Sequence, residues 1–391
     1  MFLAIACVGS DSIPTRNPSQ ATNDMSATAI TESASRISNE EIGGEIANIA
    51  PEFGGLNGWI NGGPLTIKDL RGQVVLIDFW TYTCINCIRT FRFLRQWQSR
   101  YADEGLVIVG IHAPEFEFEK IYDNVVEATR TNNLTWTIAQ DNDFVTWRKY
   151  SNRFWPAKYL IDKDGFIRYT HFGEGGYAET ESLIRELLAE TNPCFLKTSL
   201  LLPEAQTLDH NFLTSQDGEV TRELYAGFER GETDFLFGQG GYVQQMSYFQ
   251  SKNQIGEFVI EKELEPHKIN FQGSWFVGPE STTHGRTTAN YEDYLSLVYS
   301  ATSVNVVLNG KSGEPYKVLV TAGDKYLTDE NKGSDIVIGE DGESYLLVTT
   351  PTLYNVINND SYVRRGTLNM SSNSPDFELF AFTFGIYDTG P

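Results

Sequence analysis

Two cysteines separated by two residues, Cys84 and Cys87, have the spacing in this 391-residue chain that most clearly indicates chemistry. Such a pair serves as half of a zinc site, as a structural disulfide or as a redox pair. A zinc site needs further ligands at short spacing, but Cys7 and Cys194 are isolated and the five histidines are scattered. A disulfide that closes so short a loop adds little stability. The sequence therefore favours a redox-active disulfide, with no metal and no other cofactor.

A redox pair of this kind needs a strand before it and a helix after it. Residues 73–80, QVVLIDFW, form a continuous apolar run that predicts a buried central strand. After the cysteines, apolar residues recur every three or four positions and predict one helix face: Ile88, Phe91, Leu94, Trp97 and Tyr101. The start of that helix stabilises a thiolate, so we expect Cys84 to attack and Cys87, one turn deeper, to resolve.

Two flanking residues fit the same chemistry. Asp78 lies in the apolar strand, where burial would raise its pKa and let it accept the Cys87 proton. Pro156 directly precedes a predicted strand, and a cis proline there would expose a backbone edge to a substrate strand. The alternatives are an aspartate that faces solvent and an ordinary trans proline.

The chain divides by composition into three parts. Residues 1–48 hold a short lipoprotein-like start and, from about residue 8, a stretch rich in Ser, Thr, Asn and Ala that predicts a flexible tether. Residues 49–193 alternate predicted strands and helices and end on an antiparallel hairpin with a KDG turn, which predicts an α/β domain. Residues 197–391 carry short β-rich runs between turns and predict an antiparallel sandwich or jelly roll of about eight to ten strands.

The stretch VVLIDFWTYTCINC, residues 74–87, resembles the signature of thioredoxin. The resemblance implies an α/β thioredoxin fold in which Asp78 matches a buried aspartate, Trp80 a tryptophan at the substrate side and Pro156 the cis proline. A helix predicted within residues 117–133 resembles the insertion of TlpA-like thioredoxins of the redoxin type. Glu115 matches a glutamate that those proteins place beside the active site, where it would tune the cysteine pKa.

Longer stretches resemble the extracytoplasmic part of DipZ-type proteins. They are WTYTCINC, APEFEFEK, NRFWPAKYLID and HFGEGGYAETE, followed by YAGFERGE, GSWFVGPES and FAFTFG beyond residue 200. The resemblance covers about residues 50–391 and implies a C-terminal β-sandwich like a carbohydrate-binding module. DipZ-type proteins also carry a membrane electron-transfer domain. This sequence does not, so we expect an electron-donating membrane thiol reductase to act in trans.

The charge and the first residues bear on location. The chain has fifty-two acidic and thirty basic residues, so its net charge is −22, which argues against binding to nucleic acid. No apolar run reaches the ~18 residues that span a bilayer. The start MFLAIACVGS resembles the end of a bacterial lipoprotein signal, with Cys7 as the lipidation candidate. We expect a location in the periplasm or cell envelope, with a lipid anchor at Cys7 or with a frayed or truncated terminus.

The leading function is a thiol-disulfide oxidoreductase that reduces disulfides in client proteins. Trp155 and Pro156 would shape the substrate edge, and Gly173 and Glu174, in the turn GEGG, would touch substrate. His112 and His171 are more readily explained as core or loop residues, and Cys194 as a structural thiol.

Two alternatives remain. Thr81, three residues before Cys84, matches a peroxidase pattern, but that pattern also wants a proline where Ile77 stands. A glycan-binding or cell-wall-binding protein with an accessory thioredoxin domain would use exposed aromatic residues in the sandwich, with core packing as the competing explanation. The candidates are Trp275, Tyr242, Tyr248 and Tyr291.

Overall fold

The computed structural model describes residues 48–192, 195, 220–232, 241–260, 263–310 and 312–385. Cys7, Cys194 and nearly all of the predicted tether lie outside the described residues. Contacts divide the chain into two compact units that interleave in sequence. The first unit holds the chain up to Trp80, Arg92–Ala113 and the chain from Leu134, and the second holds Thr81–Phe91, Pro114–Asn133 and the C-terminal part from Asn211.

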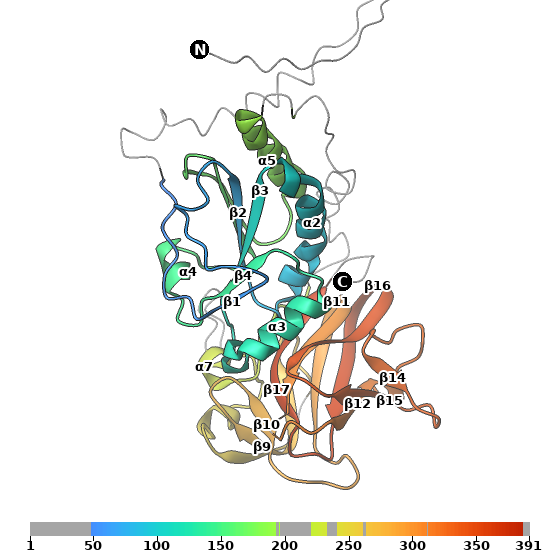
Figure 1. Cartoon of the computed structure of the whole chain (residues 1–391). Helices are drawn as coiled ribbons and strands as arrows, with labels where there is room; N and C mark the ends of the chain where they lie inside the picture. The colour runs from blue at the N-terminus through green and yellow to red at the C-terminus, as the bar shows by residue number, and fades with distance from the viewer. Residues whose placement is uncertain are drawn as a thin grey trace, which may run out of the picture. The chain divides into compact units, whose positions relative to one another are not determined.

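The first unit is built on a mixed six-stranded sheet in the order β1-β4-β3-β2-β5-β6. The central strand β2 pairs in parallel with β3 and antiparallel with β5, which leads into the antiparallel β6 (Figure 1). The strand bounds are β1 Gly58–Ile60, β2 Val74–Trp80, β3 Leu106–His112, β4 Thr137–Gln140, β5 Ala157–Ile161 and β6 Ile167–Phe172. The predicted buried strand and the closing hairpin are confirmed.

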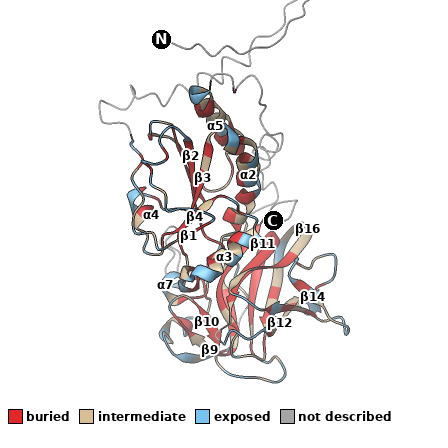
Figure 2. Cartoon of the chain, in the orientation of Figure 1, coloured by how far each residue is buried: buried red, intermediate tan, exposed pale blue. Residues whose placement is uncertain are grey.

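Strand β2 is buried on both faces, which explains its unbroken apolar sequence (Figure 2). Because side chains alternate along a strand, Val75, Ile77 and Phe79 share one face, where they pack in a core with α4 (Val145–Lys149). Asp78 and Trp80 therefore face the other side. Helix α5 (Tyr177–Thr191) packs against β2, and α2 (Ile85–Tyr101) runs beside it (Figure 1).

The helix after the cysteines follows the sequence pattern. The predicted helix within 117–133 is a 3-10 turn, η3 (Glu117–Lys120), followed by α3 (Tyr122–Thr131). A further 3-10 turn, η2 (Ala102–Glu104), extends α2. Within the described ranges, none of the helices has the length and apolar character needed to cross a bilayer.

The C-terminal part is all antiparallel, with eleven strands in one connected sheet. Two long strands organise it, because β11 (Tyr294–Asn309) pairs with β16 (Thr352–Ser371) along its length, and with β9 and β17 at its two ends. The remaining strands are β7 Leu224–Tyr225, β8 Ile255–Phe258, β9 Ile269–Val277, β10 Thr282–His284, β12 Tyr316–Ala322, β13 Lys325–Tyr326, β14 Ile336–Ile338, β15 Ser344–Val348 and β17 Glu378–Gly385.

The predicted fold class, a thioredoxin-like α/β fold followed by an antiparallel β region, is confirmed. The expected count of eight to ten strands was too low for the described residues, because β7 and β13 are two residues each and leave no alternation to detect. The jelly-roll topology stays a prediction. Short helical turns, α7 (Phe228–Gly231) and η5 (Tyr248–Gln250), interrupt the strands.

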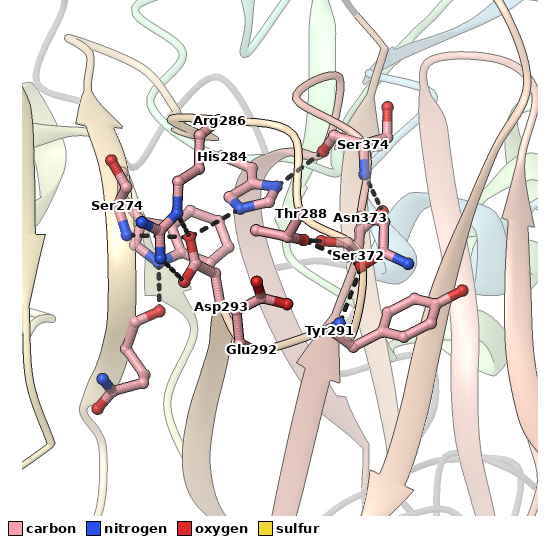
Figure 3. A network of polar contacts seen from close by, with 12 residues as sticks. Ser274, His284, Arg286, Thr288, Tyr291, Glu292, Asp293, Ser372, Asn373 and Ser374 are labelled. Atoms are coloured by element: carbon pink, nitrogen blue, oxygen red, sulfur yellow. Dashed lines mark hydrogen bonds and ion pairs between the residues drawn. The ribbon is translucent and has the colours of Figure 1, made fainter.

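A buried ionic network ties together loops of the β region (Figure 3). Asp293 accepts hydrogen bonds from the Arg286 guanidinium at 2.6 and 2.7 Å and from the Ser274 N–H at 3.2 Å. The His284 ring contacts Asp293 Oδ2 through Nε2 at 3.1 Å and the Ser374 carbonyl through Nδ1 at 2.9 Å. The two ring nitrogens of His284 therefore lie against a carboxylate oxygen and a carbonyl oxygen, which link it to two different loops.

Candidate active site

The cysteine pair lies at the junction between β2 and α2. Cys84 directly precedes the helix, is half-buried, and its carbonyl accepts the N–H of Ile88 at 3.1 Å. Cys87 lies inside the first turn and is fully buried. Both cysteines are free thiols. Because Cys84 is half-buried and Cys87 is fully buried, an incoming disulfide can reach Cys84 but not Cys87.

The ionisation of Cys84 differs from the sequence expectation. The Cys87 N–H donates to Cys84 Sγ at 3.2 Å, which is the stabilising contact expected at a helix start. Burial nevertheless raises the pKa of the Cys84 thiol well above its ordinary value, and Cys87 and the negative charge of Glu223 raise it further. The hydrogen bond at the helix start therefore lowers the pKa of Cys84, but by less than burial and the neighbouring groups raise it.

A buried carboxyl that the sequence analysis missed fixes the loop before Cys84. Glu119 is fully buried, accepts the Thr83 hydroxyl and a hydrogen bond from Thr81, and accepts the N–H groups of Glu115 and Phe116. Burial and the nearby Glu115 charge raise the pKa of Glu119 to about 7, although the hydrogen bonds that Glu119 accepts oppose the rise. The sequence carried no usable signal for it, because the residue three positions earlier, Phe116, has no side-chain oxygen that would mark a capping box.

Glu115, the predicted tuning residue, is held by residues of the C-terminal part of the second unit. Its carboxylate forms an ion pair with Arg230 and accepts the Tyr225 hydroxyl at 3.0 Å. Tyr225 also lies 3.0 Å from Glu223 Oε2. The sequence analysis named none of these three partners, because their contact joins segments over 100 residues apart.

Asp78 lies in the first unit with a buried lysine as its neighbour. The two residues are directly opposite in the β2–β5 register, and Lys158 Nζ is 3.6 Å from Asp78 Oδ1. No residue in the described ranges donates a hydrogen bond to the Asp78 carboxylate. Burial raises the pKa of Asp78 to about 6, although Lys158 opposes the rise. The expectation of a buried aspartate is therefore confirmed, and its role in proton transfer stays a prediction.

Trp80 and His112 form a buried pair at the ends of β2 and β3. Their rings meet edge to face with centroids 4.9 Å apart, and both residues are essentially inaccessible. Burial lowers the pKa of His112 to about 3, so the imidazole is neutral. His112 is a core residue, as expected. Trp80 is 1% exposed, and its predicted contact with substrate stays a prediction.

The remaining predicted substrate residues gather around the ends of β5 and β6. The Trp155–Pro156 peptide bond is cis, as expected, and the Trp155 indole donates to the Ala113 carbonyl at 3.0 Å. The Gly173 N–H donates to the Pro156 carbonyl at 2.8 Å, and the Glu174 carbonyl lies 3.0 Å from His171 Nε2. Gly173 has φ of +85°, a conformation that favours glycine. Substrate contact by this group stays a prediction.

The aromatic residues proposed for glycan stacking are mostly core residues. Trp275 and Tyr248 are fully buried and Tyr242 is nearly so, whereas Tyr291 is half-buried. The Trp275 indole donates to the Gln272 carbonyl at 2.9 Å and packs on Phe377. The packing favours the structural explanation for Trp275, Tyr248 and Tyr242.

Two family models match the chain. Residues 46–170 match the AhpC/TSA family, and residues 221–385 match the model described as "Thioredoxin like C-terminal domain". The first match spans the cysteine pair and the Asp78 strand. The second spans the segment that supplies Glu223, Tyr225 and Arg230, together with the antiparallel strands.

Relatives cover both parts of the chain. Protein DipZ of Mycobacterium tuberculosis is 35% identical over 296 residues, which are 72% of this chain, and the chain spans 40% of the length of that protein. Thiol-disulfide oxidoreductase YkuV of Bacillus subtilis is 30% identical over 142 residues, 36% of this chain and 95% of the relative. A solution structure of a thioredoxin-like protein in the oxidized form is 28% identical with a TM-score of 0.35, over 37% of this chain and 98% of the other. The chain belongs to the thioredoxin-like thiol-disulfide oxidoreductases.

Proposed function

We propose that the chain reduces disulfide bonds in partner proteins through Cys84 and Cys87. The observation that carries the proposal is the difference in access between the two thiols. Cys84 is half-buried at the helix start, whereas Cys87 is fully buried inside the first turn. An attacking thiol that is accessible and a resolving thiol that is protected are what stepwise exchange requires.

The reaction proceeds in two exchange steps. The Cys84 thiolate attacks a client disulfide, a mixed disulfide forms and one client sulfur leaves as a thiolate that takes a proton. Cys87 then loses its proton, attacks Cys84 Sγ and releases the second client thiol. The client gains two electrons and two protons, and the chain is left with a Cys84–Cys87 disulfide. Asp78, whose pKa burial raises to about 6, is the proposed acceptor of the Cys87 proton.

We place the chain outside the cytoplasm and assign its regeneration to a membrane thiol reductase. The support is the resemblance to the extracytoplasmic part of DipZ-type proteins and the identity to Protein DipZ over 72% of the chain. Client proteins of such an enzyme carry disulfides, which form and persist in oxidising compartments.

A thiol peroxidase is the second candidate, because the first part matches the AhpC/TSA family and Thr81 precedes Cys84 by three residues. The hydroxyl of Thr81 hydrogen-bonds Glu119, however, and Ile77 stands at the position where the peroxidase pattern has proline. Rapid hydrogen peroxide consumption that depends on Cys84 would favour this candidate over disulfide reduction.

The deciding experiment is trapping with the Cys87→Ser variant of the full chain. The variant should accumulate mixed disulfides at Cys84 with a disulfide-bonded model protein such as insulin, detected by non-reducing electrophoresis and mass spectrometry. Cys84→Ser is the matched control and should trap nothing. If Cys87→Ser also traps nothing while the wild type reduces insulin, the assigned order of the two cysteines is wrong. If the wild type does not reduce insulin either, the reductase proposal fails.

A further inference from the structure

The loop between β2 and Cys84 is held by one buried carboxyl group of η3. Glu119 is fully buried, and one of its oxygens accepts the Thr83 hydroxyl while the other accepts the N–H of Phe116 at 3.1 Å. Thr83 is itself buried and directly precedes Cys84. A shift of η3 would therefore reach the residue next to the attacking thiol, because a buried hydrogen bond is costly to break.

The same loop sets the position of the Cys84 sulfur. The Cys84 N–H donates to the Thr81 carbonyl at 3.4 Å, and the Cys87 N–H donates to Cys84 Sγ at 3.2 Å. Thr81 is fully buried, and its hydroxyl also hydrogen-bonds Glu119. Glu119 therefore binds both ends of the turn that places Cys84 against the start of α2. The loop, η3 and the β region all belong to the second unit.

The β region in turn supports η3 by aromatic packing. Phe380 of β17 meets the rings of Phe116 and Phe118 edge to face, with centroids 5.0 and 4.8 Å apart. All three side chains are buried. Just before η3, the carboxylate of Glu115 forms its ion pair with Arg230. The position of η3 is therefore fixed by contacts with the C-terminal part as well as by its own turn.

A β-bulge in β17 directs Phe380 to η3. Leu379 and Ala381 pair with adjacent residues of β11, so Phe380 has no partner in that strand. Leu379 and Phe382 both pack in the core of the β region, although an odd spacing normally puts two side chains on opposite faces of a strand. A bulge inserts one residue and re-aims side chains in this way. Phe380 is the inserted residue, and it packs on η3.

We propose that the β region sets the geometry of the redox pair through Phe380 and η3, with Glu119 as the positioning residue that acts on Cys84 through Thr83. The β region is then a working part of the redox site. A loop held in place keeps the two sulfurs close and raises their effective concentration for each other. Loss of this support should weaken the Cys84–Cys87 disulfide. The inference rests on the proposed use of these cysteines as a redox pair.

Equilibrium of the full chain with glutathione measures this effect without a client protein. The Cys84–Cys87 dithiol and one oxidised glutathione give the protein disulfide and two reduced glutathione molecules, so two electrons and two protons pass to glutathione. Alkylation and mass spectrometry of the peptide that carries both cysteines give the oxidised fraction. Glu119→Leu should lower the equilibrium constant for disulfide formation about tenfold, which raises the reduction potential by about 30 mV. Glu119→Gln keeps hydrogen bonds to Thr83 and Phe116 and should stay close to the wild type.

Phe380→Ala tests the support that comes from the β region, and it should lower the same equilibrium constant. Phe382→Ala is the matched control, because Phe382 is a fully buried phenylalanine of the same strand that packs in the β-region core. It should destabilise the β region in urea unfolding and leave the glutathione equilibrium unchanged. Should either alanine variant fail to fold, as judged by circular dichroism, Phe380→Leu and Phe382→Leu replace the pair.

Unchanged equilibrium constants in Glu119→Leu or in Phe380→Ala would overturn the proposal. An equal shift in Phe382→Ala would overturn it as well, because the effect would then follow stability and not the contact with η3. The reductase function fails separately. Shifted constants in these variants, with no reduction of insulin by the wild type, would reject that function and keep the positioning role. Insulin reduction by the wild type with unshifted variants would do the opposite.

Discussion

Lys158 and Asp78 face each other across β2 and β5 with their charged atoms 3.6 Å apart, and both side chains are removed from solvent. Burial of two charges costs more than a surface pair does, and the structure leaves the Asp78 oxygens without a hydrogen bond from the described residues. Burial raises the pKa of Asp78 to about 6, and Lys158 limits the rise. The pair holds a carboxyl poised to exchange a proton near neutral pH.

Replacing Lys158 by methionine should raise the pKa of Asp78 above 6, because the opposing positive charge is lost. A carboxyl that binds its proton more tightly in the folded state stabilises the fold at low pH. That stability is lost as the pH rises from 3.8, the ordinary pKa of an aspartate, through the pKa of Asp78 in the folded state. In the wild type this loss should be complete just above pH 6, and in Lys158→Met it should continue to higher pH, by about 1.4 kcal/mol per pH unit.

Urea unfolding between pH 4 and pH 9 measures this window. Lys163→Met is the matched control, because Lys163 lies in the turn after β5, is 38% exposed and pairs with Asp164. Parallel curves of unfolding free energy for Lys158→Met and the wild type would show that Lys158 does not act on Asp78.

The strand before the cysteines and the helix after them were predictable because each has a local period. Asp78 stood out in the same way, as one charge in the apolar run of β2. The cis bond before Pro156 followed only from family resemblance. The strand, the helix and the position of Asp78 were predictable because each depends on residues that are neighbours in sequence.

The partners of the site were not predictable, because they come from distant segments. Lys158 could be read as an exposed strand lysine until the β2–β5 register placed it opposite Asp78. Glu223, Tyr225 and Arg230 lie over 100 residues from Glu115, and no periodicity links the two segments. Trp275 shows a related limit, since the sequence left both core packing and surface stacking open, and an aromatic residue in a β-rich run cannot be assigned to core or surface without its register.

Glu119 should make the loop before Cys84 sensitive to pH. Burial raises its pKa from 4.5 to about 7, so stability should fall as pH rises through that range. Glu119→Gln should remove this fall, because the amide oxygen can accept the Glu115 and Phe116 N–H groups while the amide nitrogen faces Thr83. Urea unfolding at pH 5 and pH 8 is the measurement.

Glu119→Leu is the informative contrast, because it leaves the same donors unpaired at equal volume. Each buried donor left without an acceptor costs about 1–3 kcal/mol, so Glu119→Leu should be much less stable than Glu119→Gln at both pH values. Equal stability of the two variants would mean that Glu119 does not hold the loop.

Trp275→Ala should destabilise the β region by about 3–5 kcal/mol, because it empties a fully buried site among aromatic neighbours. The loss should appear in urea unfolding with no glycan present. Tyr326→Ala, an exposed aromatic on the same sheet, should change stability little. A stable Trp275→Ala variant that has lost binding to a polysaccharide would instead support a stacking role.

His284→Leu should be among the most damaging single changes in the β region. It removes one hydrogen bond from Asp293, which is nearly inaccessible, and one from the Ser374 carbonyl (Figure 3). Burial raises the pKa of Asp293, but Arg286, His284 and the Ser274 N–H outweigh it and hold the pKa below 3.8. Breaking one partner of such a buried pair costs about 3–5 kcal/mol. Arg286→Gln should cost less, because that side chain is 48% exposed and water can replace it.

The pH profile separates this charge network from simple packing. A carboxyl with a lowered folded pKa contributes stability above 3.8 that is lost as pH falls through its folded value. Removing His284 should raise the Asp293 pKa, so the acid-induced loss in His284→Leu should begin at higher pH than in the wild type. The double variant His284→Leu/Asp293→Leu should recover part of the single-variant loss, because no unbalanced carboxylate remains. Additive losses in urea unfolding would show that the two residues do not act as a pair.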